Sequence, residues 1–240
     1  MGIRKHIPNA ITSMNLLSGC FSMIFAVNGN FQASFLCIIA AAIFDFCDGF
    51  AARLLKAYSP MGKELDSLAD MVSFGVAPTM MLFSFMQNIT TSYWVFAPLL
   101  IAVFSGLRLA KFNIDTRQSE NFIGLATPAC AMLCGSMMYA LTVYTQIAEF
   151  FTEHFYIIPV LSALLSYLLV SEIPMFSFKF KNFKWSGNSA RFIFVGVVAL
   201  LGVAIYVTEL NWSVWVISVF TSYIIINIAA FPFTKQALRK

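Results

Sequence analysis

Long apolar stretches separated by short polar breaks run along almost the whole sequence. Stretches of about 17–25 mostly apolar residues are typical of helices that span a membrane. A soluble domain of 240 residues needs a polar surface, and this chain is 60% hydrophobic and only 11% charged. The pattern predicts an all-α integral membrane protein in which residues 1–240 form a single membrane domain. We expect about eight transmembrane helices, at residues 10–27, 33–57, 63–86, 93–110, 125–147, 156–171, 191–207 and 213–232.

The positions of the basic residues agree with these eight expected helices. If the N-terminus is cytoplasmic, all 15 Lys and Arg residues fall on the cytoplasmic side and the outer loops carry none. Because positive charge favours that side, both termini are expected to be cytoplasmic, in an inner cell membrane. The basic face suits membrane lipids with anionic headgroups or a phosphate-bearing substrate. Nucleic acid is not an expected partner, since the sequence has no basic and aromatic soluble surface.

Four aspartates interrupt the second and third apolar stretches. Asp45 and Asp48 are three residues apart, and Asp66 and Asp70 are four apart. Each spacing places both carboxylates on one face of a helix. The two helices are expected to form a hairpin with a cytoplasmic turn at residues 58–62, so the four side chains can converge in the inner half of the membrane.

Four converging carboxylates repel one another strongly in a low dielectric and need compensation. Few basic residues lie close by along the chain, Arg53 and Lys63 among them. Oxygen-only ligands favour a hard divalent cation, Mg²⁺ or Mn²⁺, and four carboxylates can hold two such ions, as in phosphoryl-transfer sites. Alternatively, the aspartates line a transport pathway or pair with basic residues of other helices. A cation transporter predicts paired broken helices in two related halves, and the sequence has no such symmetry.

Small residues lie between the two aspartate pairs. Pro60 and Gly62 are expected to be turn residues. Gly49, Ala52 and Gly62 leave space for a bulky ligand close to the helix backbone. Arg53 is placed to bind phosphate oxygens.

Together these positions resemble the CDP-alcohol phosphotransferase family. The chain matches the family signature without a departure, as Asp45-x2-Asp48-Gly49-x2-Ala52-Arg53-x8-Gly62-x3-Asp66-x3-Asp70. The resemblance implies that an alcohol hydroxyl attacks the phosphorus of a CDP-linked lipid or alcohol and that CMP leaves. It implies two metal ions bound by the aspartates and a nucleotide bound near Gly49, Ala52, Arg53 and Gly62. Homodimers are common in the family, so a homodimer is a possible assembly. It also makes Asp70 the candidate general base, free to share metal binding.

Four further stretches resemble the phosphatidylserine synthase branch of this family. They are "IPNAITSMNLLSG" (7–19), "GLRLAKFN" (106–113), "FIGLATPA" (122–129) and "SEIPMFSFK" (171–179). Lys111 and Ala126 depart from the branch pattern, in which arginine and proline are commoner. The resemblance implies that CDP-diacylglycerol and L-serine are the substrates, and phosphatidylserine and CMP the products.

A zwitterionic acceptor such as serine needs a cation for its carboxylate. Arg108, Lys111 and Lys179 are candidates. Alternatively, these basic residues at the inner face only set the orientation of the protein in the membrane. Asn113 and Thr127 can hydrogen-bond an acceptor or simply cap and pack helices. Glycerol 3-phosphate or inositol phosphate would be alternative acceptors, and their phosphate would demand a denser arginine cluster.

Overall fold

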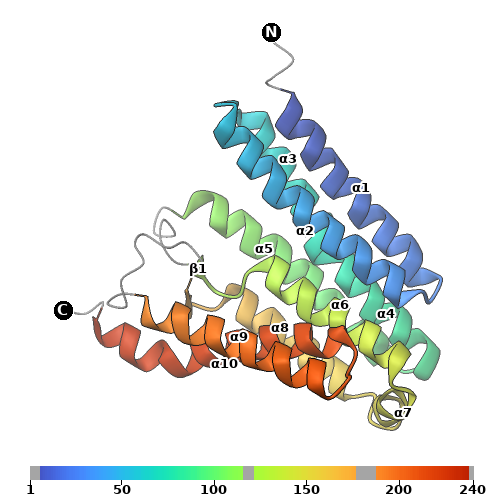
Figure 1. The fold of residues 1–240 in the computed structure, drawn as a ribbon. Coiled ribbons are helices and arrows are strands. Elements are labelled where there is room, and N and C mark those ends of the chain that lie inside the picture. The colour runs from blue at the N-terminus through green and yellow to red at the C-terminus, as the bar shows by residue number, and fades with distance from the viewer. Residues whose placement is uncertain (1–5, 116–121, 177–187, 238–240) are drawn as a thin grey trace.

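Residues 6–115, 122–176 and 188–237 are described by the computed structural model, and these parts of the chain are almost entirely helical (Figure 1). The strands within them are β1 (Phe122–Ile123) and β2 (Pro174–Met175), which pair antiparallel with Phe122 opposite Met175. The helices are α1 (Ile7–Val27), α2 (Phe31–Leu54), α3 (Pro60–Asp70), the π-helix η2 (Met71–Val76), α4 (Ala77–Ile89), the 3-10 helix η3 (Tyr93–Phe96), α5 (Leu99–Ile114), α6 (Thr127–Val143), α7 (Thr145–Glu153), α8 (Ile157–Val170), α9 (Ser189–Val207) and α10 (Trp212–Ala237).

Every predicted apolar stretch is mainly helical, but the number of membrane-spanning helices differs from the expected eight. Five helical segments in the described residues are long and apolar enough to cross a membrane, and the bent pair α6–α7 makes six if it is one span. The apolar helices Ile157–Val170 and Arg191–Val207 are shorter. At about 1.5 Å per residue, the 14 residues of α8 fall short of a hydrocarbon core about 30 Å thick. The count of eight is therefore not confirmed.

The predicted helix at residues 125–147 is wrong at its C-terminal end. Helix α6 ends at Val143, and α7 makes an angle of 111° with it. Helix α7 has Glu149 and Glu153 on one side, Ile147 and Phe150 on another, and no buried residue. Such an amphipathic helix favours a position across the end of the bundle rather than inside an apolar span, and Figure 1 shows α7 nearly end-on in that position.

The connection between α2 and α3 also differs from the expected turn. Pro60 and Gly62 are not loop residues, because α3 begins at Pro60. The Ser59 hydroxyl caps this helix by accepting the Gly62 N–H at 3.0 Å, and proline is suited to the first helical turn. The loop is therefore residues 55–59, and Gly62 lies one turn inside the helix. Both termini of the described chain lie at the end of the bundle away from α7 (Figure 1).

Helix α1 approaches the π-helix η2 very closely. The Ser73 hydroxyl donates a hydrogen bond of 2.9 Å to the carbonyl of Asn15, and both residues are buried. A Cβ atom on Gly19 would lie 2.4 Å from Ser73 Oγ and 2.8 Å from Ser73 Cα. The missing side chain at Gly19 thus lets α1 pack against the chain segment that follows Asp70.

We expect Gly19→Ala to destabilise the protein, because the added methyl group overlaps the backbone of Ser73. Overpacking of this kind typically costs about 1–3 kcal/mol. Gly196→Ala is the matched control, since a Cβ at Gly196 in α9 meets nothing within 4 Å. The midpoint of thermal unfolding of the purified protein in detergent checks this: only Gly19→Ala should lower it, and equal midpoints for the two variants would contradict the prediction.

Candidate active site

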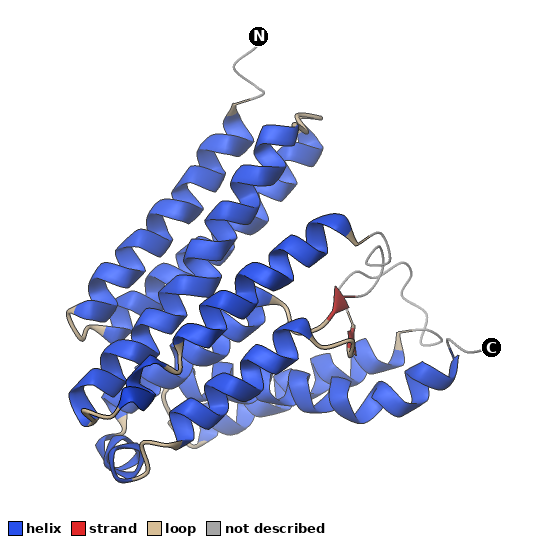
Figure 2. Ribbon diagram, turned by 180° about the vertical axis from the view of Figure 1, so that it is seen from behind, coloured by secondary structure: helices blue, strands red, loops and turns tan. Residues whose placement is uncertain are grey.

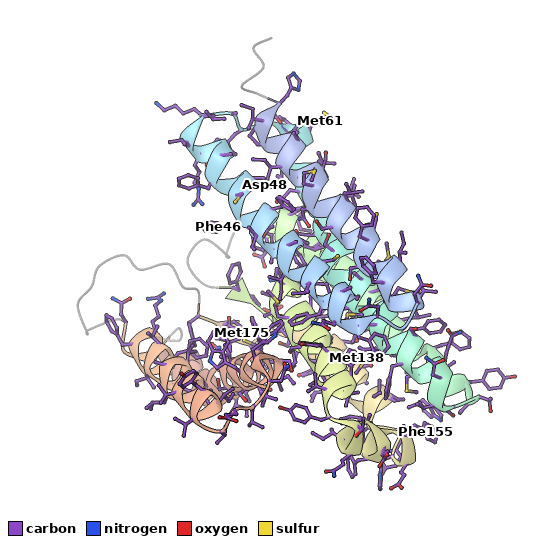
Figure 3. All side chains as sticks on the ribbon, turned by 45° about the vertical axis from the view of Figure 1, so that its right-hand side comes forward. Phe46, Asp48, Met61, Met138, Phe155 and Met175 are labelled. Carbon is purple, nitrogen blue, oxygen red and sulfur yellow. The ribbon has the colours of Figure 1, made fainter. Side chains whose placement is uncertain are left out.

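Three of the four predicted aspartates come together between α2 and α3. Asp45, Asp48 and Asp66 each offer one carboxylate oxygen, and these oxygens lie within 4.8 Å of one another. Asp48 is buried, and Figure 3 shows that it and the exposed Phe46 both lie on α2. Asp48 Oδ2 and Asp66 Oδ1 are buried without a hydrogen-bond partner among the described residues. Unpaired carboxylate oxygens this close together fit a hard divalent cation.

Asp70 lies one helical turn beyond Asp66 and is not part of that three-carboxylate group. Its Oδ1 accepts a hydrogen bond of 3.3 Å from Asn15 Nδ2 of α1. It lies within electrostatic range of Asp45 and Asp66. Asp70 is also the last residue of α3 before η2, and π-helical turns often occur at functional sites. The residue is therefore well placed beside the group, and its chemical role stays a prediction.

A cavity of about 210 Å³ lies next to the three aspartates, at the end of α2 and the beginning of α3. Its wall includes Asp48, Asp66 and the three small residues that the sequence singled out, Gly49, Ala52 and Gly62. A Cβ atom on Gly49 would meet nothing within 4 Å, so the space above this glycine is open. The small residues and two of the carboxylates thus face one shared cavity.

Helix α1 supplies residues of this cavity to which the sequence analysis gave no role in the site. Pro8, Asn9 and Thr12 line it, and Asn9 Oδ1 lies 3.0 Å from the position of a Cβ on Gly62. A signal for them existed in the sequence, because the polar residues Asn9, Thr12 and Asn15 recur every three residues along this apolar helix and share one face. The buried residues of α1 are Pro8, Thr12, Asn15, Gly19, Ser22 and Ala26.

Arg53 does not line the cavity. Its exposed side chain folds back along α2, and Nε donates a hydrogen bond of 3.1 Å to the carbonyl of Gly49. Gly49 itself lines the cavity, so the guanidinium group lies at the rim. The proposed contact of Arg53 with phosphate stays a prediction.

Arg108 is a buried cation on α5. Its side chain is 6% exposed, and its Nε has no hydrogen-bond partner among the described residues. The guanidinium carbon lies 5.9 Å from the centre of the Phe112 ring, and the group is within electrostatic range of Asp70 and Tyr223. A buried arginine without a hydrogen-bonding anion is costly, which makes this residue a candidate for binding an anionic group.

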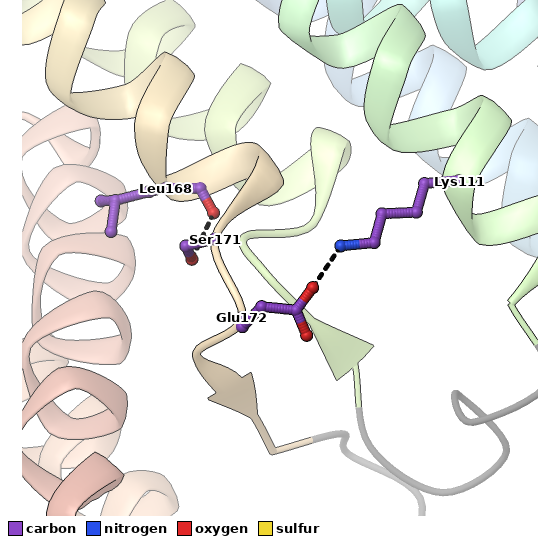
Figure 4. A network of polar contacts seen from close by, with 4 residues as sticks. All are labelled: Lys111, Leu168, Ser171 and Glu172. Carbon is purple, nitrogen blue, oxygen red and sulfur yellow. Dashed lines mark hydrogen bonds and ion pairs between the residues drawn. The ribbon is translucent and has the colours of Figure 1, made fainter.

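Lys111, by contrast, has an anionic partner. It forms an ion pair with Glu172, beside Ser171, whose hydroxyl donates a hydrogen bond of 2.9 Å to the carbonyl of Leu168 (Figure 4). The pair ties the end of α5 to the segment that follows α8. Lys111 is thus better placed to fix this connection than to bind an acceptor, and Lys179 lies outside the described residues.

The remaining two acceptor candidates differ from each other. Asn113 Nδ2 donates a hydrogen bond of 2.9 Å to Ser67 Oγ, and its carbonyl accepts one of 3.2 Å from Lys63 Nζ. These bonds attach the end of α5 to α3. Thr127 begins α6 and is fully buried, and its hydroxyl has no hydrogen-bond partner among the described residues. Thr127 therefore remains available to a ligand, whereas the Asn113 side chain already joins two helices.

Comparison with known proteins supports the resemblance seen in the sequence. Residues 5–180 match the family model described as CDP-alcohol phosphatidyltransferase. The chain is 38% identical over 176 residues to the CDP-diacylglycerol–serine O-phosphatidyltransferase of Mycobacterium leprae, covering 70% of this chain and 57% of that protein. It is 35% identical over 184 residues to the Bacillus subtilis protein of the same name, covering 75% of this chain and 92% of the relative. The Helicobacter pylori protein of that name is 33% identical over 190 residues, which are 78% of this chain and 77% of that protein.

Proposed function

Because the chain belongs to the CDP-alcohol phosphatidyltransferase family, we propose that it transfers the phosphatidyl group of CDP-diacylglycerol to the hydroxyl group of L-serine. The products are phosphatidylserine and CMP. The observation that carries the proposal is the group formed by Asp45, Asp48 and Asp66, whose carboxylate oxygens lie within 4.8 Å of one another beside a cavity lined by small residues. The names of the three relatives support serine as the acceptor.

The CDP end of the lipid is proposed to occupy the cavity beside Gly49, Ala52 and Gly62. The absence of side chains at the two glycines lets a nucleotide approach the helix backbone, and Arg53 at the rim binds its pyrophosphate. Two Mg²⁺ or Mn²⁺ ions, held by Asp45, Asp48 and Asp66 with Asp70 free to share in their binding, would neutralise phosphate oxygens when bound. The unpaired oxygens of Asp48 and Asp66 support this assignment.

Serine is proposed to bind between Asp70 and Arg108. Arg108 pairs with the serine carboxylate, and the buried Thr127 hydroxyl can hydrogen-bond the acceptor. Lys111 and Asn113 are the weaker acceptor candidates, because Glu172 and Ser67 already bind them. Asp70 takes the hydroxyl proton while the serine oxygen forms a bond to phosphorus and the bond from phosphorus to the CMP oxygen breaks. Asn15 holds Oδ1 of Asp70, which leaves Oδ2 to receive the proton. This single displacement predicts inversion at phosphorus.

The orientation in the membrane follows from the charges. With the eight spans expected from the sequence and a cytoplasmic N-terminus, all 15 Lys and Arg residues lie on one side. We therefore propose that residues 1–240 form one domain in the inner cell membrane, with both termini and the active site facing the cytoplasm. A water-soluble acceptor such as serine then reaches the site without crossing the membrane.

The function is tested by measuring CMP release from CDP-diacylglycerol by the purified protein. L-serine, glycerol 3-phosphate and inositol phosphate are offered separately as acceptors. We expect release with serine, and phosphatidylserine as the lipid product. Release with a phosphorylated alcohol in place of serine would overturn the proposed acceptor and keep the family chemistry, whereas no release with any acceptor would overturn the activity.

Arg53→Lys is expected to weaken the use of CDP-diacylglycerol more than the use of serine. Lysine keeps the positive charge but loses the bidentate geometry with which arginine binds pyrophosphate oxygens. Steady-state KM values for the two substrates check this, with Lys56→Arg, on the loop that follows α2, as the control for a changed basic residue at this face. A raised KM for serine with an unchanged KM for the CDP-lipid would instead assign Arg53 to the acceptor.

A further inference from the structure

We propose that Tyr223 and Asn227 of α10 are positioning residues for the acceptor site. Together they hold the backbone of Phe176, directly after β2, and so fix one wall around Arg108. The inference rests on the proposed function, because it takes Arg108 to be the residue that binds the acceptor. It concerns a part of the chain that follows the family match at residues 5–180.

Phe176 is held at both of its backbone polar groups by one helix. Its N–H donates a hydrogen bond of 2.9 Å to Asn227 Oδ1. Its carbonyl accepts one of 3.0 Å from the Tyr223 hydroxyl. The two helical residues are also joined, since Asn227 Nδ2 donates a bond of 2.7 Å to the Tyr223 carbonyl. We call this arrangement the Phe176 clamp.

Both residues of the clamp are buried, Asn227 at 3% exposure and Tyr223 at 5%. An asparagine in the middle of an apolar helix is costly unless its amide is hydrogen-bonded. Here Oδ1 accepts from Phe176, which is 51 residues away in the sequence, and Nδ2 donates to the Tyr223 carbonyl within α10. The oxygen of the amide thus serves a tertiary contact. Asn227 is therefore explained by Phe176 rather than by α10 itself.

Aromatic packing strengthens the same contact. The Phe176 ring lies 5.1 Å from the Tyr223 ring and 5.6 Å from the Phe194 ring of α9, and both pairs are edge-to-face. The Phe194 and Tyr223 rings are 5.8 Å apart, also edge-to-face. Such pairs add to the energy of burial. The clamp thus attaches both C-terminal helices to residue 176.

A continuous set of contacts leads from the clamp to Arg108. Met175, next to Phe176, pairs with Phe122 of β1. The Phe122 ring lies 6.2 Å from the Phe112 ring, and Phe112 lies against Arg108. Helix α10 packs against β2, and Figure 2 shows the strand pair (red) near the C-terminal helices.

Tyr223 closes this path, because it lies within electrostatic range of Arg108 from the side of α10. The strand pair, through Phe122 and Phe112, and α10, through Tyr223, are therefore both linked to Arg108. Releasing Phe176 should loosen these links while leaving the cavity beside the aspartates intact, because α1, α2 and α3 line the cavity and α10 does not.

The test uses Tyr223→Phe, which keeps the ring and removes the hydroxyl, and Asn227→Leu, which removes the acceptor of the Phe176 N–H. Tyr206→Phe on the exposed face of α9 and Ser222→Ala on α10 are the matched controls. Two quantities are measured: KM and kcat for both substrates, and amide hydrogen exchange of residues 171–176 in the purified full-length protein. The second readout does not depend on activity.

We expect each clamp variant to raise the KM for serine about 3- to 10-fold, the effect of one lost hydrogen bond. The KM for CDP-diacylglycerol and kcat should stay near wild-type values, and in Asn227→Leu residues 171–176 should exchange faster. Faster exchange with an unchanged serine KM would overturn the positioning role, and unchanged exchange in Asn227→Leu would overturn the clamp.

The outcomes also distinguish a wrong acceptor from a wrong positioning role. If wild type uses another alcohol instead of serine, the proposed acceptor is wrong. The positioning role is then tested with that alcohol, and an unchanged KM for it in both variants would overturn the role. If wild type releases no CMP with any of the acceptors, the function and the positioning role are overturned together. The exchange experiment then still tests the clamp.

Discussion

Asp45→Asn, Asp48→Asn and Asp66→Asn are each expected to abolish or severely reduce CMP release, and EDTA should do the same to the wild-type protein. The three carboxylate oxygens lie within 4.8 Å of one another. Each substitution removes one negative charge and one ligand from a site that holds cations by oxygen atoms alone. The loss should therefore appear first as weaker metal affinity.

The measurement is CMP release during titration with Mg²⁺ or Mn²⁺ after thorough chelation. Glu64→Gln is the matched control, because Glu64 is an exposed carboxylate on α3 only two residues before Asp66. This variant should keep wild-type activity and metal dependence. Full activity of the wild-type protein after complete chelation would refute the metal site.

Asp70→Asn is expected to bind Mn²⁺ and CDP-diacylglycerol nearly normally but to turn over very slowly. Asparagine has nearly the same shape and still accepts the hydrogen bond from Asn15 Nδ2, but it cannot take a proton from serine. Removal of a general base typically lowers the rate about 10²- to 10⁴-fold. Only the rate of the chemical step should fall, and the affinity for metal should not, because Asp70 stands apart from the three-carboxylate group.

Metal titration followed by single-turnover CMP release separates this role from that of a ligand. Asp66→Asn serves as the comparison and should show weakened metal binding. If Asp70→Asn loses a metal ion as completely as Asp66→Asn does, Asp70 acts mainly as a ligand. The proton of serine would then have to go to another group, such as an oxygen of the substrate's own phosphate.

Local sequence patterns were enough to place the helices approximately and to find the candidate chemistry. An apolar helix satisfies its own backbone hydrogen bonds, so its approximate extent can be read from local composition. The spacing of Asp45 from Asp48 and of Asp66 from Asp70 likewise fixes which carboxylates share a helix face. The family signature is also a local pattern, since all its positions fall within residues 45–70.

Contacts between distant parts of the chain set where some of those helices end and which of them meet. Nothing in "VYTQIAEF" breaks a helix by composition, since it has no glycine or proline, yet α6 ends before Tyr144. The Tyr144 hydroxyl accepts the N–H of Asn211 from the loop before α10 at 2.8 Å. A contact across 67 residues has no local signal in the sequence.

The same reason explains the residues of the site that sequence reasoning missed. Thr12 lines the cavity from α1, the helix that Gly19 lets lie against Ser73. Lys111 was an acceptor candidate, and only the tertiary structure brings Glu172 to it as an ion-pair partner. Periodicity tells which side chains share one face of a helix. The choice of the facing segment depends on close packing between parts of the chain distant in sequence, and that choice placed Asn15 beside Asp70 and Asn227 beside Phe176.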